Sequence, residues 1–236
     1  MVFYLRNGRS GVNKEMAKPW KKQSITIGIV LIIAGLLLGT QVPVLRQNFR
    51  EIKRADAKRD AAVIALAVFK LYEDVGEWPS TDQDGPTPSP GVDRLFSAPG
   101  HVPKMSGPSA GPGAINWGKT EHAKALSDFL FFNNPDDDSG KINHSQHNQD
   151  YATTGEKRWR GPYLETPEIR DPWGQSYVIN ARYFPGNPRY KKGIKHRVYI
   201  LSAGPNKMWE TPFDDARGDG KDAVLGDDIG VMITSR

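Results

Sequence analysis

One uncharged apolar run, from Ser24 to Leu45, constrains this chain more than any other feature. It reads SITIGIVLIIAGLLLGTQVPVL. About 20 apolar residues at a rise of 1.5 Å each span roughly 30 Å, the hydrocarbon thickness of a bilayer. A helix that is apolar on every face is rare in a chain with a hydrophobic content of only 38%. The run also lacks the A-x-A exit of a cleaved signal peptide. We therefore predict a transmembrane helix over residues 24–45, preceded by a basic cytoplasmic tail over residues 1–23.

The charges on the two sides of this run indicate lipid headgroups as a partner. Lys and Arg outnumber Asp and Glu by 32 to 27 and concentrate around the apolar run, so we expect contact with membrane lipid and not with nucleic acid. Lys and Arg are almost equally frequent on both sides, so the positive-inside rule does not fix the orientation. The chain contains no Cys, which excludes disulfides and thiolate chemistry.

Residues 46–78 predict a helical stem that continues the membrane segment. No Gly or Pro interrupts this stretch until Gly76 and Pro79. Its first turns are charged, whereas its last turns carry apolar residues at helical spacing and need a cover. These apolar positions are Ala61, Ala62, Ala65, Leu66, Val68, Phe69 and Tyr72.

Residues 79–160 form a loop-rich insertion in this prediction, because two of its stretches are dominated by Pro, Gly and Ser. One short helix is expected in HAKALSDFLFFNN, with an apolar face made of Ala125, Leu126, Phe129 and Leu130. Residues 161–236 are richer in β-branched and aromatic residues bounded by turns, which predicts antiparallel strands. The expected strands are Tyr177–Tyr183, Arg197–Leu201 and Ile229–Thr234.

These elements together predict an α+β fold. Three short strands are not stable by themselves, but they form a core when they pack against the apolar face of the stem. The expected architecture is a long N-terminal helix, made of the membrane segment and the amphipathic stem, packed on a small antiparallel sheet with a C-terminal acidic loop.

The acidic loop spans residues 214–228. Six carboxylates so close together repel one another unless solvent or a cation compensates, and calcium accepts six to eight oxygen ligands in flexible geometry. The EF-hand template fails, because taking Gly220 as its invariant glycine places Arg217 at a ligand position and Gly226 at the closing glutamate. A calcium-type loop and a solvated acidic loop both remain open. The six residues are Asp214, Asp215, Asp219, Asp222, Asp227 and Asp228.

Four motifs occur in an order that resembles the major pseudopilin family of type II secretion, within the type IV pilin-like proteins. The first two are the apolar helix that ends at Val42 and Pro43 and the stretch LYEDVGEWPST from Leu71 to Thr81. The other two are the segments Gly161–Leu164, Asp171–Gly174 and Tyr177, and the loop Tyr199–Gly204 closed by Asp227–Ile229. The resemblance covers residues 24–78 and 161–236.

The resemblance implies a single-pass inner-membrane protein with a cytoplasmic N-terminus and a periplasmic C-terminal domain. Its function would be that of a structural subunit of the pseudopilus, whose assembly drives protein export. Its partners would be itself and other pseudopilins, through the N-terminal helix, and the inner-membrane secretion platform. It further implies calcium as cofactor. The implied ligands are the backbone carbonyl of Leu201 and the side chains of Ser202, Asn206, Asp227 and Asp228, with Asn206 standing where the family commonly has Asp.

The processing motif departs from the family pattern. Members have a Gly before the cleavage site, then an aromatic residue or Met, and a Glu at the fifth mature position. Alignment on Pro43 places Lys21, Lys22 and Thr26 at these positions. A second interpretation therefore stays open, in which the chain is a membrane-anchored scaffold or binding module with a pseudopilin-like periplasmic domain that does not polymerise.

An enzyme is the alternative from another class. His144 and His147 form an H-x-x-H pair in a polar stretch, but no third ligand accompanies them. The run GPSAGPG lacks a preceding strand and contains two prolines, so it is not a phosphate-binding loop. No Ser lies in a G-x-S-x-G motif. We therefore expect no catalytic activity.

Overall fold

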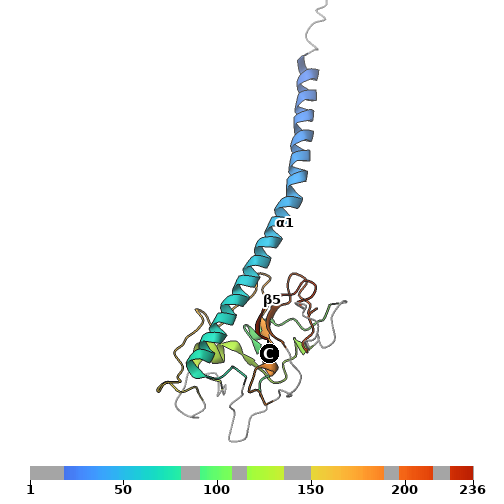
Figure 1. The fold of residues 1–236 in the computed structure, drawn as a ribbon. Coiled ribbons are helices and arrows are strands. Elements are labelled where there is room, and N and C mark those ends of the chain that lie inside the picture. The colour runs from blue at the N-terminus through green and yellow to red at the C-terminus, as the bar shows by residue number, and fades with distance from the viewer. Residues whose placement is uncertain are drawn as a thin grey trace, which may run out of the picture. The chain divides into compact units, whose positions relative to one another are not determined.

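The structure is a computed structural model that describes residues 19–80, 91–107, 116–135, 150–188, 197–214 and 224–235 (Figure 1). Side chains are not described for residues 19–27 and 32–42, nor at the end of the chain from residue 234. Most of the predicted basic tail lies outside the described residues, and much of the predicted transmembrane segment 24–45 lies outside the described side chains. In the part of the chain that was described, no helix combines the length and the apolar character that a bilayer crossing requires.

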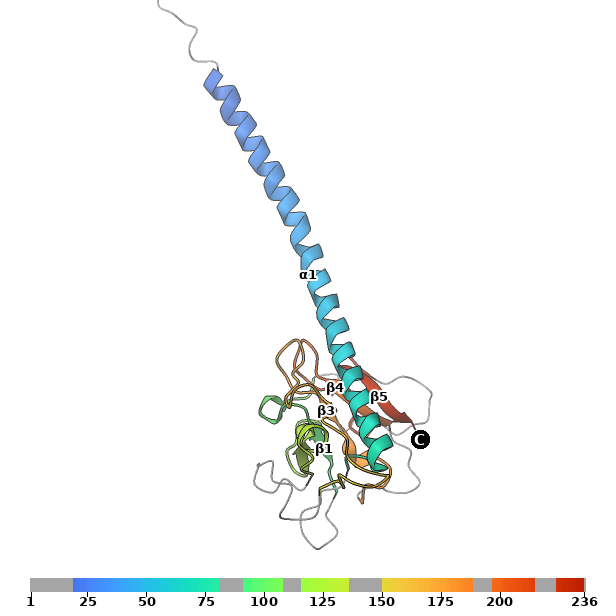
Figure 2. The same ribbon diagram turned by 90° about the vertical axis from the view of Figure 1, so that its left-hand side faces the viewer.

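The chain divides into two compact units, Met1–Glu51 and Ile52–Arg236. The described part of the first unit is helical and belongs to α1. The second unit contains the rest of α1 and all the strands, and it has an α+β fold (Figure 2). The predicted fold class is therefore confirmed at this level.

Helix α1 runs from Pro19 to Val75 and includes Pro43. The prediction of one long helix through the stem is confirmed, although the helix ends three residues before the predicted limit of 78. Gly76 ends it, with a φ of +87° and its N–H donating to the Tyr72 carbonyl at 2.8 Å. Glycine is the residue that adopts this left-handed conformation at low cost after a helix.

The sheet has five strands in the order β2-β1-β3-β4-β5. Strands β1 and β2 run parallel, and the other neighbours run antiparallel. The buried face of α1 and the buried side chains of β1, β3, β4 and β5 belong to one hydrophobic core. The strands are β1 Arg94–Phe96, β2 Ala123–Ala125, β3 Val178–Ile179, β4 Arg197–Ser202 and β5 Ile229–Ser235.

The prediction of a purely antiparallel sheet is wrong, because the insertion supplies two strands that the sequence did not indicate. Strand β1 is only three residues long and is buried throughout, so it lacks the alternation that identifies a half-exposed strand. Strand β2 lies at the edge and pairs only with β1. The loop-rich insertion 79–160 therefore forms one side of the sheet. A 3-10 turn, η1, follows β1 at Pro99–His101.

The predicted strand Tyr177–Tyr183 is too long. Its strand part is β3, and a 3-10 turn, η4, occupies Ala181–Tyr183. Asn180 makes this change of direction possible, because its buried amide takes the place of sheet hydrogen bonds. Its Nδ2 donates to the Arg197 and Phe213 carbonyls at 2.9 and 3.2 Å, and its Oδ1 accepts from the Tyr199 N–H at 2.8 Å.

The remaining local predictions are largely confirmed. Strands β4 and β5 match the predicted ranges within one residue at their C-terminal ends. The short helix predicted after His122 begins at Leu126, because Ala125 still belongs to β2, and it continues as a π-helical turn, η3, over Asp128–Phe132. Leu126, Phe129 and Leu130 are buried as expected.

Candidate functional site

Asp228 is the most unusual residue of the predicted calcium loop. It directly precedes β5 and is 6% exposed. Its Oδ2 accepts the backbone N–H groups of Glu210 and Thr211 at 2.9 and 2.6 Å. Its Oδ1 is buried and has no hydrogen-bond partner among the described residues. Burial raises the pKa of this carboxyl to about 6, although the hydrogen bonds from Thr211 and Glu210 oppose the shift.

Asp227 connects the same loop to the stem helix. Its carboxylate pairs with the Arg54 guanidinium at 2.9 Å, and its backbone N–H donates to the Glu210 carboxylate. The loop passes very close to Gly204, where a Cβ would lie 2.0 Å from the Asp227 carbonyl oxygen, so position 204 requires glycine. Its φ of +65° adds to that requirement. The loop is therefore held by Arg54 and Glu210 and packs directly against Gly204.

Glu210 is a site residue that sequence reasoning missed. Its backbone N–H donates to the Asp228 carboxylate, and its own carboxylate accepts the Asp227 N–H, so it holds both aspartates of the loop. It belongs to none of the four family-like motifs. The only sequence signal is a lone acidic residue between Trp209 and Thr211, which are both fully buried.

Ser202 and Asp171 form a second polar contact beside the loop. Ser202 Oγ donates to Asp171 Oδ2 at 2.5 Å and accepts the Gly204 N–H at 3.0 Å. Asp171 Oδ1 accepts the N–H groups of Trp173 and Gln175 at 2.9 and 2.8 Å. Burial raises the pKa of Asp171. The DPWG segment, which the sequence marks as a turn, thus contributes a buried carboxylate next to the end of β4.

The structure brings together four of the five predicted calcium ligands. Leu201 and Ser202 end β4 and are in register with Gly230 and Ile229 at the start of β5. Asp227 and Asp228 lie immediately before that start. Asn206 is exposed, and its Oδ1 accepts the Met208 N–H at 2.8 Å.

The predicted donor set meets the needs of calcium only in part. No group of three His, Asp or Glu side chains suitable for a metal occurs in the described residues, and the predicted set itself includes only two carboxylates. The buried, unpartnered oxygen of Asp228 is nevertheless an atom that a hard cation would satisfy, and every predicted donor is an oxygen. Asp215, Asp219 and Asp222 lie outside the described residues, as do His144 and His147.

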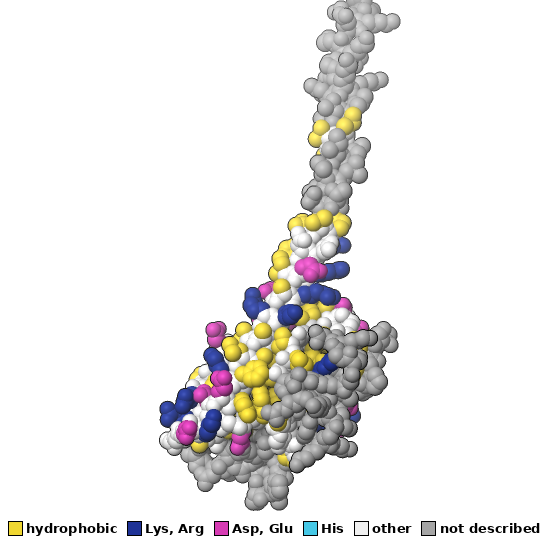
Figure 3. All heavy atoms as spheres, in the orientation of Figure 1, with side chains coloured by type: hydrophobic (Ala, Val, Ile, Leu, Met, Phe, Trp, Pro, Cys, Tyr) yellow, Lys and Arg dark blue, Asp and Glu magenta, His cyan; other side chains and the backbone are white. Residues whose placement is uncertain are grey.

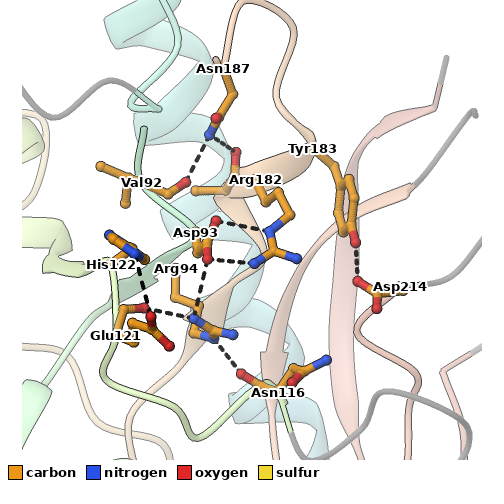
Figure 4. Close-up of polar contacts among 11 residues, drawn as sticks. Val92, Asp93, Arg94, Asn116, Glu121, His122, Arg182, Tyr183, Asn187 and Asp214 are labelled. Atoms are coloured by element: carbon orange, nitrogen blue, oxygen red, sulfur yellow. Dashed lines mark hydrogen bonds and ion pairs between the residues drawn. The ribbon is translucent and has the colours of Figure 1, made fainter. Parts of the chain in front are cut away.

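A second polar cluster lies between the insertion and the sheet (Figure 4). Arg182 binds both carboxylate oxygens of Asp93 at 2.8 and 2.5 Å. Arg94 donates to the carbonyls of Asn116 and Glu121. Burial lowers the pKa of Arg94 to about 10.

Further contacts make this cluster a structural junction. Both guanidinium groups lie over the Phe213 ring, with their Cζ atoms 4.8 and 5.7 Å from its centroid. Asn187 donates to the Val92 and Ala181 carbonyls at 2.8 and 3.1 Å. Charged groups that are paired in this way hold segments together. The cluster therefore fastens the insertion to the sheet.

Comparison of the chain with protein-family models, with curated proteins and with solved structures gave no match. The resemblance to pseudopilins rests on the sequence motifs.

Proposed function

We propose that this chain is a structural subunit of a type II secretion pseudopilus. The observation that carries the proposal is α1, a single helix from Pro19 to Val75 that includes the uncharged run and whose last turns belong to the core of the α+β unit. This is the arrangement that a subunit needs if its helix assembles a filament and its globular part stays folded outside the membrane.

The N-terminal part of α1 supports a membrane location in this proposal. Its described large apolar side chains are 52% to 67% exposed. Such side chains require lipid or other helices around them. In the proposal, the helix waits in the inner membrane and then packs against helices of other copies and of other pseudopilins at the secretion platform. These side chains are Ile29, Val30, Leu31, Val44, Leu45 and Phe49.

The mechanism proposed is mechanical. Growth of the filament pushes folded cargo outward while the globular unit stays periplasmic, and no side chain does chemistry on a substrate. Calcium, in the same proposal, binds through the Leu201 carbonyl and the side chains of Ser202, Asn206, Asp227 and Asp228, and it joins the last two strands. The buried Asp228 Oδ1 is the atom that supports it. Free calcium at 100 times its dissociation constant would add about 2.7 kcal/mol to the free energy of unfolding.

A second function is favoured by the processing site. Lys21, Lys22 and Thr26 replace the residues that the family uses for cleavage and for assembly. A chain that keeps its basic tail would be a permanent membrane anchor, and its globular unit would then act as a scaffold or binding module.

The N-terminus and the intact mass of the protein from its own membranes test the two functions. Loss of the first twenty or so residues, together with filaments in the sheared fraction, supports the pseudopilus. An intact N-terminus without filaments contradicts it and favours the anchored module. The membrane location is tested with Val30→Arg, which should release the protein from alkali-washed membranes. The control Gln47→Arg adds the same charge to an exposed position beyond the run and should stay bound.

A further inference from the structure

Arg54 is a cation of the stem helix that already pairs with one carboxylate of the acidic loop. Its Nη2 lies 2.9 Å from Asp227 Oδ1, and the two side chains are 42% and 37% exposed. An ion pair with this much contact with water is held weakly, because solvent competes for both charges. Asp227 is also one of the two carboxylates in the predicted calcium site. The chain itself therefore supplies a positive charge beside an oxygen that calcium would use.

Two further cations of α1 lie close to the same loop. Lys53 Nζ donates to the Pro172 carbonyl at 3.1 Å. Lys58, one turn after Arg54, lines a cavity of about 480 Å³ together with Asp228 and the first residues of β5. Figure 3 shows Lys and Arg side chains close together on α1, with acidic side chains among them. The stem helix therefore brings positive charge to the two aspartates of the loop.

The loop is also held by contacts that do not involve Arg54. Asp228 Oδ2 accepts the backbone N–H groups of Glu210 and Thr211 at 2.9 and 2.6 Å. The Asp227 N–H donates to the Glu210 carboxylate. Loss of the contact with Arg54 would thus leave the loop in place, and a cation from solution could take the position of the guanidinium.

We infer that Arg54 competes with calcium for Asp227 and thereby sets the affinity of the site. A calcium ion on Asp227 would lie within about 6 Å of the guanidinium, because calcium–oxygen distances are about 2.4 Å and the ion pair measures 2.9 Å. Like charges at this distance repel each other. Calcium binding and the Arg54–Asp227 pair therefore exclude each other. This inference rests on the calcium site of the proposed function and adds to it a link between the metal and the stem helix.

The sign of one effect distinguishes competition from a supporting role of Arg54. If Arg54 instead held Asp227 in the orientation that calcium needs, its removal would weaken calcium binding. If Arg54 competes, its removal strengthens binding, because the metal no longer has to displace a cation. By thermodynamic linkage, calcium must then weaken the contact between the loop and α1 by the same factor.

Calorimetric titration of the full-length protein in detergent with calcium alone tests the inference. Arg54→Gln should bind calcium about threefold to tenfold more tightly than the wild type. Arg54→Lys keeps the charge and should stay within about twofold of the wild type. Arg50→Gln removes the same charge from an exposed position one turn earlier in α1, and it should also change the affinity less than about twofold. Unchanged or weaker binding by Arg54→Gln overturns the inference.

Thermal unfolding supplies a second readout. In a chelator, the midpoint of Arg54→Gln should lie about 1–3 °C below that of the wild type, because the ion pair is lost. In excess calcium the difference should disappear or reverse, since the pair is then absent from both proteins. An equal difference under both conditions would mean a purely structural ion pair and would also overturn the inference.

The outcomes separate the inference from the proposal on which it rests. Calcium binding with an affinity that Arg54→Gln leaves unchanged removes the competition and keeps the site. Absence of calcium binding in every variant removes both the competition and the calcium site. Neither result bears on the pseudopilus itself, which is tested by filaments and by the processed N-terminus.

Discussion

Asn180 shows how one buried amide determines local topology. It is completely buried and binds three backbone groups, from Arg197, Tyr199 and Phe213. These bonds let the chain leave β3 after two residues while the neighbouring backbone stays satisfied. Buried backbone groups need such partners, since an unpaired one costs about 1–3 kcal/mol.

Asn180→Ala should therefore lower the free energy of unfolding by about 3 kcal/mol or more, because three buried backbone groups lose their partner at once. Urea denaturation of the full-length chain measures the loss. Asn206→Ala is the matched control, since Asn206 is exposed and makes one local hydrogen bond, and it should cost less than about 1 kcal/mol. Equal losses for the two variants would contradict this role of Asn180.

Because Asp228 is buried, we expect the free energy of unfolding to depend on pH when a chelator removes calcium. Its pKa is about 6 in the folded protein and about 4 in an unfolded chain. The folded state therefore holds the proton more tightly, so the contribution to stability is fully present below pH 4 and is lost as the pH rises through 6. The loss amounts to roughly 2–3 kcal/mol.

Asp228→Asn cannot titrate, so the difference in unfolding free energy between the wild type and this variant isolates the effect. Between pH 4 and pH 7, the wild type should lose about 2 kcal/mol of unfolding free energy relative to Asp228→Asn. Calcium in excess should reduce the shift in the wild type, because a bound cation stabilises the charged carboxylate. Parallel stability curves for the two proteins across this pH range would exclude the assignment.

At the scale of elements, α1 carries two rows of apolar residues with different partners. The row through Ile64 and Val68 packs on the sheet, and the row through Val63 and Leu66 stays exposed. The position at which α1 ends also matters for packing. An extra helical turn would carry Trp78 away from its stack with Tyr72 and Phe184. The centroid distances in this stack are 4.2 and 4.9 Å. Gly76 provides that end.

Gly76→Ala should destabilise the protein by about 1 kcal/mol, because a Cβ strains the left-handed backbone. The nearest atom to the new Cβ, Lys157 Cδ, is at an ordinary contact distance of 3.6 Å, so strain and not a clash determines the cost. The thermal midpoint should fall by roughly 2–4 °C. Gly100→Ala is the control, since its Cβ meets nothing within 4 Å, and it should leave the midpoint unchanged. A midpoint that Gly76→Ala also leaves in place would show that another feature ends the helix.

At the scale of the whole molecule, the second unit contains every element of the core. Its buried aromatic residues come from the insertion and from the C-terminal segment alike, as in the pair Trp117 and Trp209, whose ring centroids are 5.6 Å apart. Two polar contacts hold the C-terminal part of α1 within this unit. Arg54 of the helix pairs with Asp227, and the Tyr177 hydroxyl donates to the Ala57 carbonyl of the helix. The unit therefore has the contacts that an independent domain requires.

A fragment of residues 52–236 should accordingly fold by itself. We expect one cooperative thermal transition and a strong near-ultraviolet circular dichroism signal, because Trp117 and Trp209 are completely buried in fixed surroundings. A fragment without a near-ultraviolet signal would show that residues before Ile52 are needed for folding.

Local periodicity and turn residues were enough to predict part of the fold. Helix α1 and its end near Gly76, strands β4 and β5, and the buried face of the turn through Phe129 all follow from spacing, propensity and turn residues close together in the chain. The proximity of Ser202 and Asp228 was expected only from family motifs, and the structure places both at neighbouring ends of β4 and β5.

Features that depend on contacts between distant segments could not be predicted in this way. β1 and β2 are too short to carry a pattern. β1 becomes a strand because β3 pairs with it and its side chains join the core, and β2 becomes one because β1 pairs with it. Nothing in the sequence distinguishes Glu210 from other acidic residues. The fold brings its backbone N–H to Asp228 and its carboxylate to the N–H of Asp227, just before β5. The exposed row of α1 through Val63 and Leu66 also could not be told from the buried one in the sequence, because apolar spacing along a helix does not reveal which row faces the core. Burial of Ile64 and exposure of Val63 separate the two rows, and that difference arises from the sheet, which covers one side of α1 and leaves the other accessible.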